Sequence, residues 1–394
     1  MTGSGRSSVG QMYRPRFELL DHGRGIAALM VVVYHATAQY RVVTKDPGAS
    51  AAFAGIMWLG VQLFFVISGY CIAAAVEGSF KRADHPVSGY LVRRVRRIFP
   101  PYLIWLVAIC IVIGIAQSLA PQVLGRDSYR LSSLSAANWF GNFTLTETWW
   151  PYLFGQDHRV ITRVGWTLCY EMQFYVVCML LMFLPRKWFY HGVVTVSVVL
   201  LLVFLFERPL GVQWRFQGTF LDGRWLQFAM GIWVFHAMTQ GKRRDRIVAG
   251  LCLAFVCAIS LANLSDYSFG DAIDYRTKRI LELGVCSAFS VLLLLLRALD
   301  GPVGGARFLK PVKDVGISSY SLYLVHWPIC KVIAMVAWKL GLRSFGATFF
   351  VTTPVCLVTS VLAGFVFFKF CERPFIAAPS TPVPNSTVKV SPDA

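Results

Sequence analysis

Ten apolar runs, each about long enough to cross a lipid bilayer, recur along the chain and restrict the folds open to it. A transmembrane helix needs about 20 mostly apolar residues. Short basic or turn-rich breaks separate the runs, so the sequence predicts an all-α, polytopic transmembrane helical bundle with about ten membrane helices. Only 15% of the 394 residues are charged. A soluble domain of this size would need a more highly charged surface. The predicted spans are residues 25–40, 56–76, 99–119, 166–184, 189–206, 220–238, 247–264, 280–296, 317–338 and 346–370.

The net charge of +18 follows from membrane topology rather than from a nucleic-acid partner. Lys and Arg concentrate in breaks that we place in the cytoplasm, such as residues 93–97 and 242–246. This asymmetry obeys the positive-inside rule, and an even number of spans returns the C-terminus to the side of the N-terminus. We therefore expect a multi-pass protein of a bacterial inner (plasma) membrane, with both termini cytoplasmic and the lipid bilayer as its partner.

The chain divides into a membrane domain and two polar ends. We expect residues 1–16 to be a disordered cytoplasmic N-terminus and residues 377–394 a disordered Pro-rich tail. Between them, residues 17–376 form the transmembrane domain, with one long outer loop at 120–165. The Trp and Tyr residues of this loop fit two interpretations equally well, stacking on sugars or an interfacial aromatic belt.

Arg24 and His35 on the first predicted span are eleven positions apart. At 100° per residue this is about three turns, so both side chains share one face, about 16 Å apart along the axis. Arg24 then lies at the cytoplasmic headgroups and His35 near the middle of the bilayer. A histidine there needs a polar cavity or a partner, and neutral imidazole can take a proton from a hydroxyl. The alternative is a packing histidine bonded to a neighbouring helix, but the register with Arg24 favours a functional role.

Six motifs in a fixed order resemble the acyltransferase-3 family of membrane-bound O-acyltransferases, in its stand-alone form without an appended hydrolase-like domain. They are Arg24 with His35, GVQLFFVISGY at 60–70, RRVRRIFPPY at 93–102, WTLCYEMQFY at 166–175, SLYLVHWP at 321–328 and ERP at 372–374. The resemblance implies an acyltransferase that moves an acyl group, expected to be acetyl, from acyl-CoA to a hydroxyl. The implied acceptor is a carbohydrate, a polysaccharide precursor or a glycolipid. Acyl-CoA is a donor co-substrate, and we expect no bound cofactor and no metal.

The basic run before the third predicted span supplies candidates for donor binding. Arg93, Arg94 and Arg97 can share faces of one helix, and arginine grips phosphate bidentately. The resemblance assigns them to the phosphates of acyl-CoA, and Arg94 with Arg97 fits the family's Arg-x-x-Arg pattern best. Arg24 would hold a donor phosphate or orient the site. The alternative for this run is a positive-inside anchor.

Three further residues complete the candidate site. Glu171 lies inside an apolar span and needs a partner or a proton; it is a catalytic candidate that could orient His35, bind an acceptor hydroxyl or pair with an arginine. His326 either bonds a backbone carbonyl freed by Pro328 or faces the cavity of His35. Tyr70 is a substrate-binding candidate, with helix packing as its alternative.

These assignments give a reaction and its rivals. His35 acts as a general base on the acceptor hydroxyl, although a covalent acyl-histidine route stays open. One alternative is acylation of a small secondary metabolite. Another, of a different class, is a membrane transporter or flippase of glycans or lipids that uses the same buried charges. Many secondary transporters are built from internal repeats. No internal duplication is visible in this sequence, which counts against the transporter interpretation.

Overall fold

The computed structural model describes residues 17–44, 54–82, 85–119, 131–150, 160–161, 164–206, 218–262 and 275–376. Within these segments the chain is helical and contains no strand. The expectations for residues 1–16 and 377–394 lie outside the described residues, as does much of the predicted outer loop. The described part of that loop carries a 3₁₀ turn, η2 (Leu131–Ser133), and an α-helix, α6 (Ala136–Thr144). The all-α prediction is therefore confirmed for the described chain.

Each predicted span falls on one long helix. These helices are α1 (Leu19–Ala36), α4 (Gly60–Arg82), α5 (Pro86–Leu119), α8 (Gly165–Leu181), α9 (Phe189–Phe206), α10 (Arg224–Thr239), α11 (Arg243–Ala262), α12 (Tyr275–Leu296), α15 (Ser319–Lys339) and α17 (Thr353–Phe367). The shorter helices are α2 (Ala38–Thr44), α13 (Asp300–Gly304), α14 (Lys310–Ile317), α16 (Phe345–Ala347) and α18 (Arg373–Ile376). Two π-helical turns, η7 (Thr348–Thr352) and η8 (Phe368–Glu372), flank α17.

Seven helices of the described chain are long and apolar enough to cross a membrane. The polytopic architecture is thus confirmed, whereas the count of about ten membrane helices remains a prediction. The three remaining predicted spans correspond to α1, α8 and α10. α8 and α10 have only 17 and 16 residues, and α1 carries Asp21, His22 and Arg24 in its first two turns. These are helices whose polar side chains face the interior of the bundle, where such groups are tolerated.

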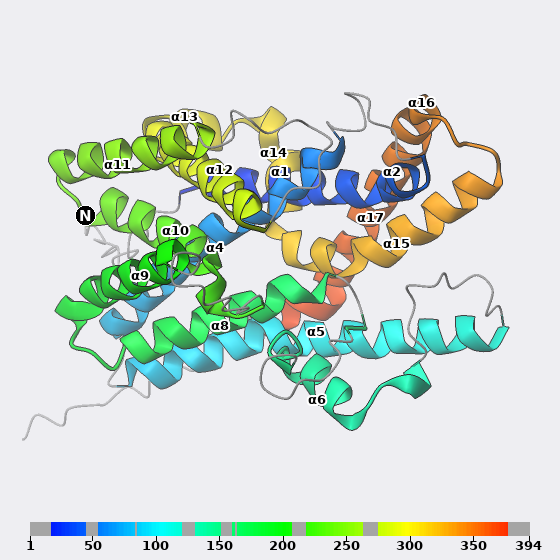
Figure 1. The fold of residues 1–394 in the computed structure, drawn as a ribbon, viewed down its shortest axis with the longest axis horizontal. Coiled ribbons are helices and arrows are strands. Elements are labelled where there is room, and N and C mark those ends of the chain that lie inside the picture. The colour runs from blue at the N-terminus through cyan, green and yellow to red at the C-terminus, as the bar shows by residue number, and fades with distance from the viewer. Residues whose placement is uncertain are drawn as a thin grey trace, which may run out of the picture.

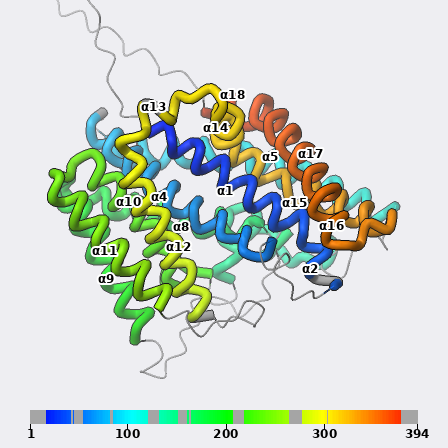
Figure 2. Tube along the Cα trace, turned by 90° about the horizontal axis from the view of Figure 1, so that it is seen from above, coloured from blue at the N-terminus to red at the C-terminus, as the bar shows by residue number. Residues whose placement is uncertain are grey.

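The helices that carry the candidate site meet in the middle of the molecule. α1 runs through the centre, with α4, α14 and α15 beside it (Figure 2). α5 and α8 lie along one side of the bundle, α9 to α12 gather at one end, and α15 to α17 lie at the other (Figure 1). α1, α4, α5, α8 and α15 therefore surround a common interior.

Glycines allow two of the central helix pairs to approach closely. A Cβ added at Gly69 on α4 would lie 1.9 Å from the carbonyl oxygen of Phe228 on α10. A Cβ added at Gly316 on α14 would lie 1.7 Å from the carbonyl oxygen of Asp21 on α1. Only glycine fits such contacts, in the manner of small-residue helix interfaces in membranes. These contacts fix the positions of α1 and α4, and hence of the side chains they carry into the interior.

Candidate active site

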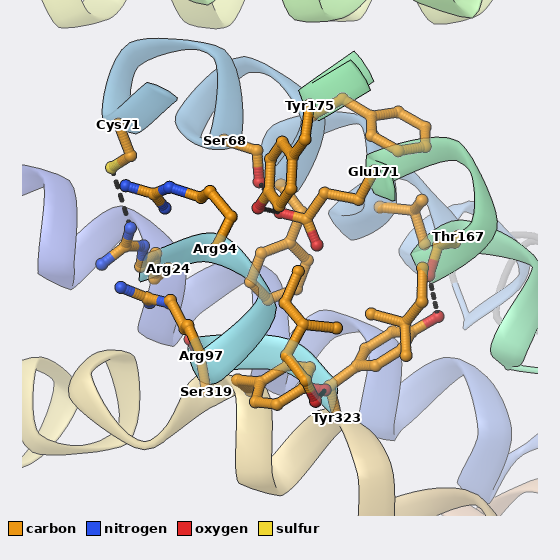
Figure 3. Close-up of a pocket in the computed structure, with 16 residues that line it drawn as sticks. Arg24, Ser68, Cys71, Arg94, Arg97, Thr167, Glu171, Tyr175, Ser319 and Tyr323 are labelled. Atoms are coloured by element: carbon orange, nitrogen blue, oxygen red, sulfur yellow. Dashed lines mark hydrogen bonds between the residues drawn. The ribbon is translucent and has the colours of Figure 1, made fainter. Parts of the chain in front are cut away.

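A cavity of about 90 Å³ lies between α1, α4, α5, α8 and α15 (Figure 3). Four of the residues predicted from the sequence line it: Arg24, Arg94, Arg97 and Glu171. Its other lining residues are apolar, aromatic or small and polar: Val61, Phe64, Phe65, Ser68, Cys71, Ile98, Thr167, Leu168, Tyr175, Ser319, Tyr320 and Tyr323. Residues far apart in the sequence thus form one mixed polar and apolar chamber.

Three guanidinium groups gather at one end of this cavity (Figure 3). Arg24 Nη2 donates to Cys71 Sγ at 2.8 Å, and Arg24 Nη1 lies 3.2 Å from the Asp21 carboxylate. Arg94 and Arg97 reach the cavity from α5, where three positions along a helix share a side. Across the described segments neither of them forms a salt bridge. This end of the cavity therefore offers two guanidinium groups without a salt bridge in the described segments, which suit an anionic group.

Glu171 faces the same cavity, and two hydroxyl groups hold its carboxylate. Ser68 Oγ and Tyr175 OH both donate to Oε1, at 2.7 and 2.6 Å. No described group donates to Oε2, and Glu171 forms no salt bridge with the described arginines. The structure thus does not pair Glu171 with an arginine, one of the three roles left open above. It leaves a fixed carboxylate with one oxygen available to a bound molecule.

His35 lies against His326, with 5.2 Å between the ring centroids. His326 Nδ1 is 2.7 Å from the carbonyl oxygen of Tyr323 and 3.2 Å from that of Leu322. Carbonyl oxygens only accept hydrogen bonds, so Nδ1 of a neutral ring carries the hydrogen and Nε2 keeps a lone pair. This Nε2 is buried and has no hydrogen-bond partner in the described part of the chain. These carbonyl partners are not the one that Pro328 releases, which is that of Leu324, four residues before the proline. His326 lies against His35, and neither histidine lines the cavity.

Tyr323 connects the histidine pair with the cavity. Its ring lines the cavity and lies 5.6 Å from the ring of His326. Its hydroxyl donates to the Val164 carbonyl oxygen at 2.6 Å and also contacts Thr167 Oγ1. His35 itself is not among the lining residues. α1 therefore carries Arg24 to the cationic end of the cavity and His35 to a neighbouring position behind Tyr323.

Two predicted substrate-binding residues lie away from the cavity. Tyr70 is buried, with its ring 6.0 Å from that of Phe17 and 5.2 Å from that of Phe235. Arg93 is exposed and donates to Ser79 Oγ at 2.6 Å. Neighbouring positions on a helix point about 100° apart, so Tyr70 and Arg93 do not line the cavity although Cys71 and Arg94, the residues that follow them, do. The structure does not bring them together with the other candidates.

Several cavity residues were missed from the sequence, although helical spacing points to them. Ser68 and Cys71 are three residues apart on α4, and both line the cavity. Tyr175 is four residues after Glu171 and bonds to it. Tyr323 is three residues before the second histidine. Positions three and four apart share a helix face, so Tyr175 and Tyr323 could have been found from Glu171 and His326, two residues that the sequence already marks as candidates.

Glu372 is a further buried carboxyl that was noted only as part of a motif. It accepts a hydrogen bond from Ser321 Oγ, and its Oε1 has no partner in the described chain. Glu372 ends the π-helical turn η8, and π-turns are frequent at functional sites. Glu372 thus places a buried carboxyl beside Ser321 of α15.

Glu147 is a buried carboxyl outside the predicted membrane spans, in the described part of the outer loop. It is 2% exposed and accepts a hydrogen bond from Cys169 Sγ at 2.9 Å. Burial raises the pKa of this carboxyl to about 7. Glu147 does not line the cavity, so its titration bears on the stability of the loop rather than on the cavity's charge.

Comparisons with known proteins agree with the motifs. Residues 17–369 match the model of a protein family described as an acyltransferase domain. The exopolysaccharide production protein ExoZ of Rhizobium meliloti is 27% identical over 320 residues, which cover 80% of this chain and 89% of ExoZ. The O-acetyltransferase OatA of Staphylococcus aureus is 26% identical over 344 residues, 81% of this chain and 51% of OatA. The chain thus spans most of ExoZ but about half of OatA. No solved structure matches it.

Proposed function

Because the chain belongs to the acyltransferase-3 family and is a membrane acyltransferase, we propose that it transfers an acetyl group from acetyl-CoA to a hydroxyl of a carbohydrate, a polysaccharide precursor or a glycolipid. The observation that carries this proposal is the cavity itself, in which three arginines face a fixed carboxylate next to a histidine pair. The names of ExoZ and OatA, which refer to exopolysaccharide production and O-acetyl transfer, support this acceptor class and acyl group.

The arginine end of the cavity binds the donor. Arg94 and Arg97 form no salt bridge within the described residues, so a phosphate of acetyl-CoA can accept hydrogen bonds from their guanidinium groups without displacing one. Arg24 is oriented by Asp21 and Cys71 and completes the cluster.

The histidine pair supplies the base for transfer. The acceptor O–H loses its proton to the imidazole of His35 as its oxygen attacks the thioester carbonyl carbon. The C–S bond then breaks, the acetyl group stays on the acceptor oxygen, and the thiolate takes up the proton and leaves as coenzyme A. The lone pair of His326 Nε2 faces a buried environment beside His35, and a hydrogen bond to it would fix the orientation of the His35 ring. This route needs one step fewer than an acyl-histidine intermediate.

Glu171 orients the acceptor. Ser68 and Tyr175 hold one carboxylate oxygen, so the side chain is pre-organised while Oε2 can accept a hydrogen bond from a sugar hydroxyl. The same carboxylate contributes the negative charge that opposes the arginine end. A neutral Gln at this position keeps the size of the side chain but weakens both interactions.

Mass spectrometry of cell-surface glycans and glycolipids tests the proposal. A strain that lacks the gene should lose O-acetyl groups, the wild-type copy should restore them, and His35→Ala should not, at equal abundance of the protein in membranes. His22→Ala is the matched control, because His22 is on the same helix but bonds the Glu18 carbonyl and lies thirteen residues, about 20 Å along the helix axis, from His35. Unchanged acetylation in the deletion strain would contradict the proposal.

A further inference from the structure

A second hollow, of about 630 Å³, lies on the outside of the bundle between α11 and α12. Its lining includes Arg243, the first residue of α11, and Arg297, the residue directly after the end of α12. The start of α11 thus lies beside the end of α12. The two helices therefore run antiparallel, and Figure 1 shows them at the end of the bundle away from α15 and α17. Both are long and apolar enough to cross a membrane. The hollow, here called the α11–α12 groove, thus faces the surrounding lipid and is separate from the cavity.

The α11–α12 groove has a cationic end and an apolar wall. Arg243, Arg246 and Arg297 line its end, and none of them forms a salt bridge within the described chain. The rest of the lining is apolar or small and includes the exposed side chains of Leu251 and Leu295. Leu251 is five residues after Arg246, about 7 Å further along the helix axis. The arrangement is thus positive at the helix ends and hydrocarbon-like toward the helix middle.

Among the described residues, no acidic side chain lines the α11–α12 groove to balance these arginines. Asp245 is nearby in sequence, but its carboxylate accepts the backbone N–H of Lys242 at 2.7 Å and caps the start of α11. A ligand that fits must therefore bring an anionic head and an apolar body. Basic pockets between membrane helices near the headgroup region bind acidic lipids for this reason.

We propose that the α11–α12 groove is a binding site for an anionic glycerophospholipid of the surrounding bilayer. The phosphate lies among Arg243, Arg246 and Arg297, and an acyl chain follows the leucine wall. Two observations show that the groove has space for a lipid chain and that the rest of the protein leaves α11 largely uncovered. A Cβ built at Gly250, in the wall of the groove, meets no atom within 4 Å. Only 11% of the apolar window of α11 is buried by the rest of the chain, the smallest share among the seven candidate spans. The lipid therefore holds α11 against α12.

Native mass spectrometry of the full-length protein in detergent, with phosphatidylglycerol or phosphatidylcholine of identical acyl chains, tests the site. We expect tighter binding of phosphatidylglycerol, weakened about fivefold for each arginine replaced by Gln and on the order of 100-fold for Arg243, Arg246 and Arg297 together. Arg244→Gln is the matched control, because Arg244 is exposed on the same turn but does not line the groove. Phosphatidylglycerol should also raise the apparent Tm of the wild-type protein, since a ligand stabilises the state that it binds.

Gly250→Phe tests the apolar wall without removing charge. The added ring points into open space, so the fold should persist while the acyl chain is excluded and phosphatidylglycerol binding falls. Equal binding of both lipids, or phosphatidylglycerol binding that survives Gly250→Phe and the triple arginine variant, would overturn the proposal. So would competition by inorganic phosphate alone at matched concentration, which would identify a site for a free anion rather than a lipid.

Discussion

Replacing Gly316 with Ala should reduce acyl transfer although Gly316 does not line the cavity. The new Cβ would lie 1.7 Å from the carbonyl oxygen of Asp21 and 2.7 Å from its carbonyl carbon. Both atoms belong to the backbone of α1, so no side-chain rotation relieves the clash. Asp21 also bonds Arg24 through its carboxylate. The substitution therefore displaces the part of α1 that presents Arg24 to the cavity.

The size of the effect follows from this distance. Ordinary contacts begin at 3.4 Å, so α14 and α1 must separate by about 1.7 Å. Overpacking of this kind destabilises a protein by roughly 1–3 kcal/mol. A misplacement of about 1 Å in an active site can lower the rate on the order of 100-fold. We expect Gly316→Ala to fold with a reduced apparent Tm and to lose at least that factor in kcat/KM.

The assay is release of coenzyme A thiol by purified protein, read together with the apparent Tm in detergent. Gly78→Ala is the matched control, because Gly78 lies inside α4 and a Cβ there meets no atom within 4 Å. It should keep full activity and gain stability of about 0.5–1 kcal/mol from helix propensity. Full activity in Gly316→Ala, or equal losses in both variants, would refute the reasoning.

Three other predictions follow from the site. Arg94→Gln should raise the KM for acetyl-CoA at least tenfold, whereas the exposed neighbour variant Arg96→Gln should leave it unchanged, and steady-state kinetics separates the two. Ser68→Ala should lower kcat roughly 10- to 100-fold, because it removes the hydrogen bond to the Glu171 carboxylate. Such a bond contributes about 1.5–3 kcal/mol. An unchanged kcat would show that Ser68 does not position Glu171. Because burial raises the pKa of Glu147 to about 7 in the folded protein, above its unfolded value of about 4.3, folding favours the protonated carboxyl. Stability should fall as pH rises between these values, and Glu147→Gln should flatten this part of the Tm profile.

The sequence predicted the membrane helices well because their signal is local. Each apolar run of about 20 residues determines a helix by itself, and the structure places a helix on every predicted span. The register of Arg24 and His35 was readable for the same reason, since α1 includes both residues. The number of helices that cross the membrane was harder to predict. This number depends on α1, α8 and α10, which are shorter or carry more polar side chains than the seven candidate spans.

Contacts between distant segments could not be read from spacing. His35 and His326 meet only because α1 packs against α15. The hydrogen of His326 is assigned to Nδ1 because this atom contacts two backbone carbonyl oxygens of its own helix. Sequence spacing does not show these contacts. Likewise, Arg93 and Arg94 are adjacent in one basic run, yet Arg94 lines the cavity and Arg93 bonds Ser79. Which face of a helix is turned inward is decided by its neighbours.

The most direct test of the account is a measurement of acetyl transfer by the purified protein. Protein in lipid nanodiscs is incubated with radiolabelled acetyl-CoA and a glycolipid and polysaccharide extract from a strain that lacks the gene. Coenzyme A release and label in the extract are quantified together. The account predicts that both occur in equal amounts, require the extract, and are lost in His35→Ala but not in His22→Ala. Label transfer that persists in His35→Ala, or movement of glycolipid across the bilayer without covalent labelling, would contradict it.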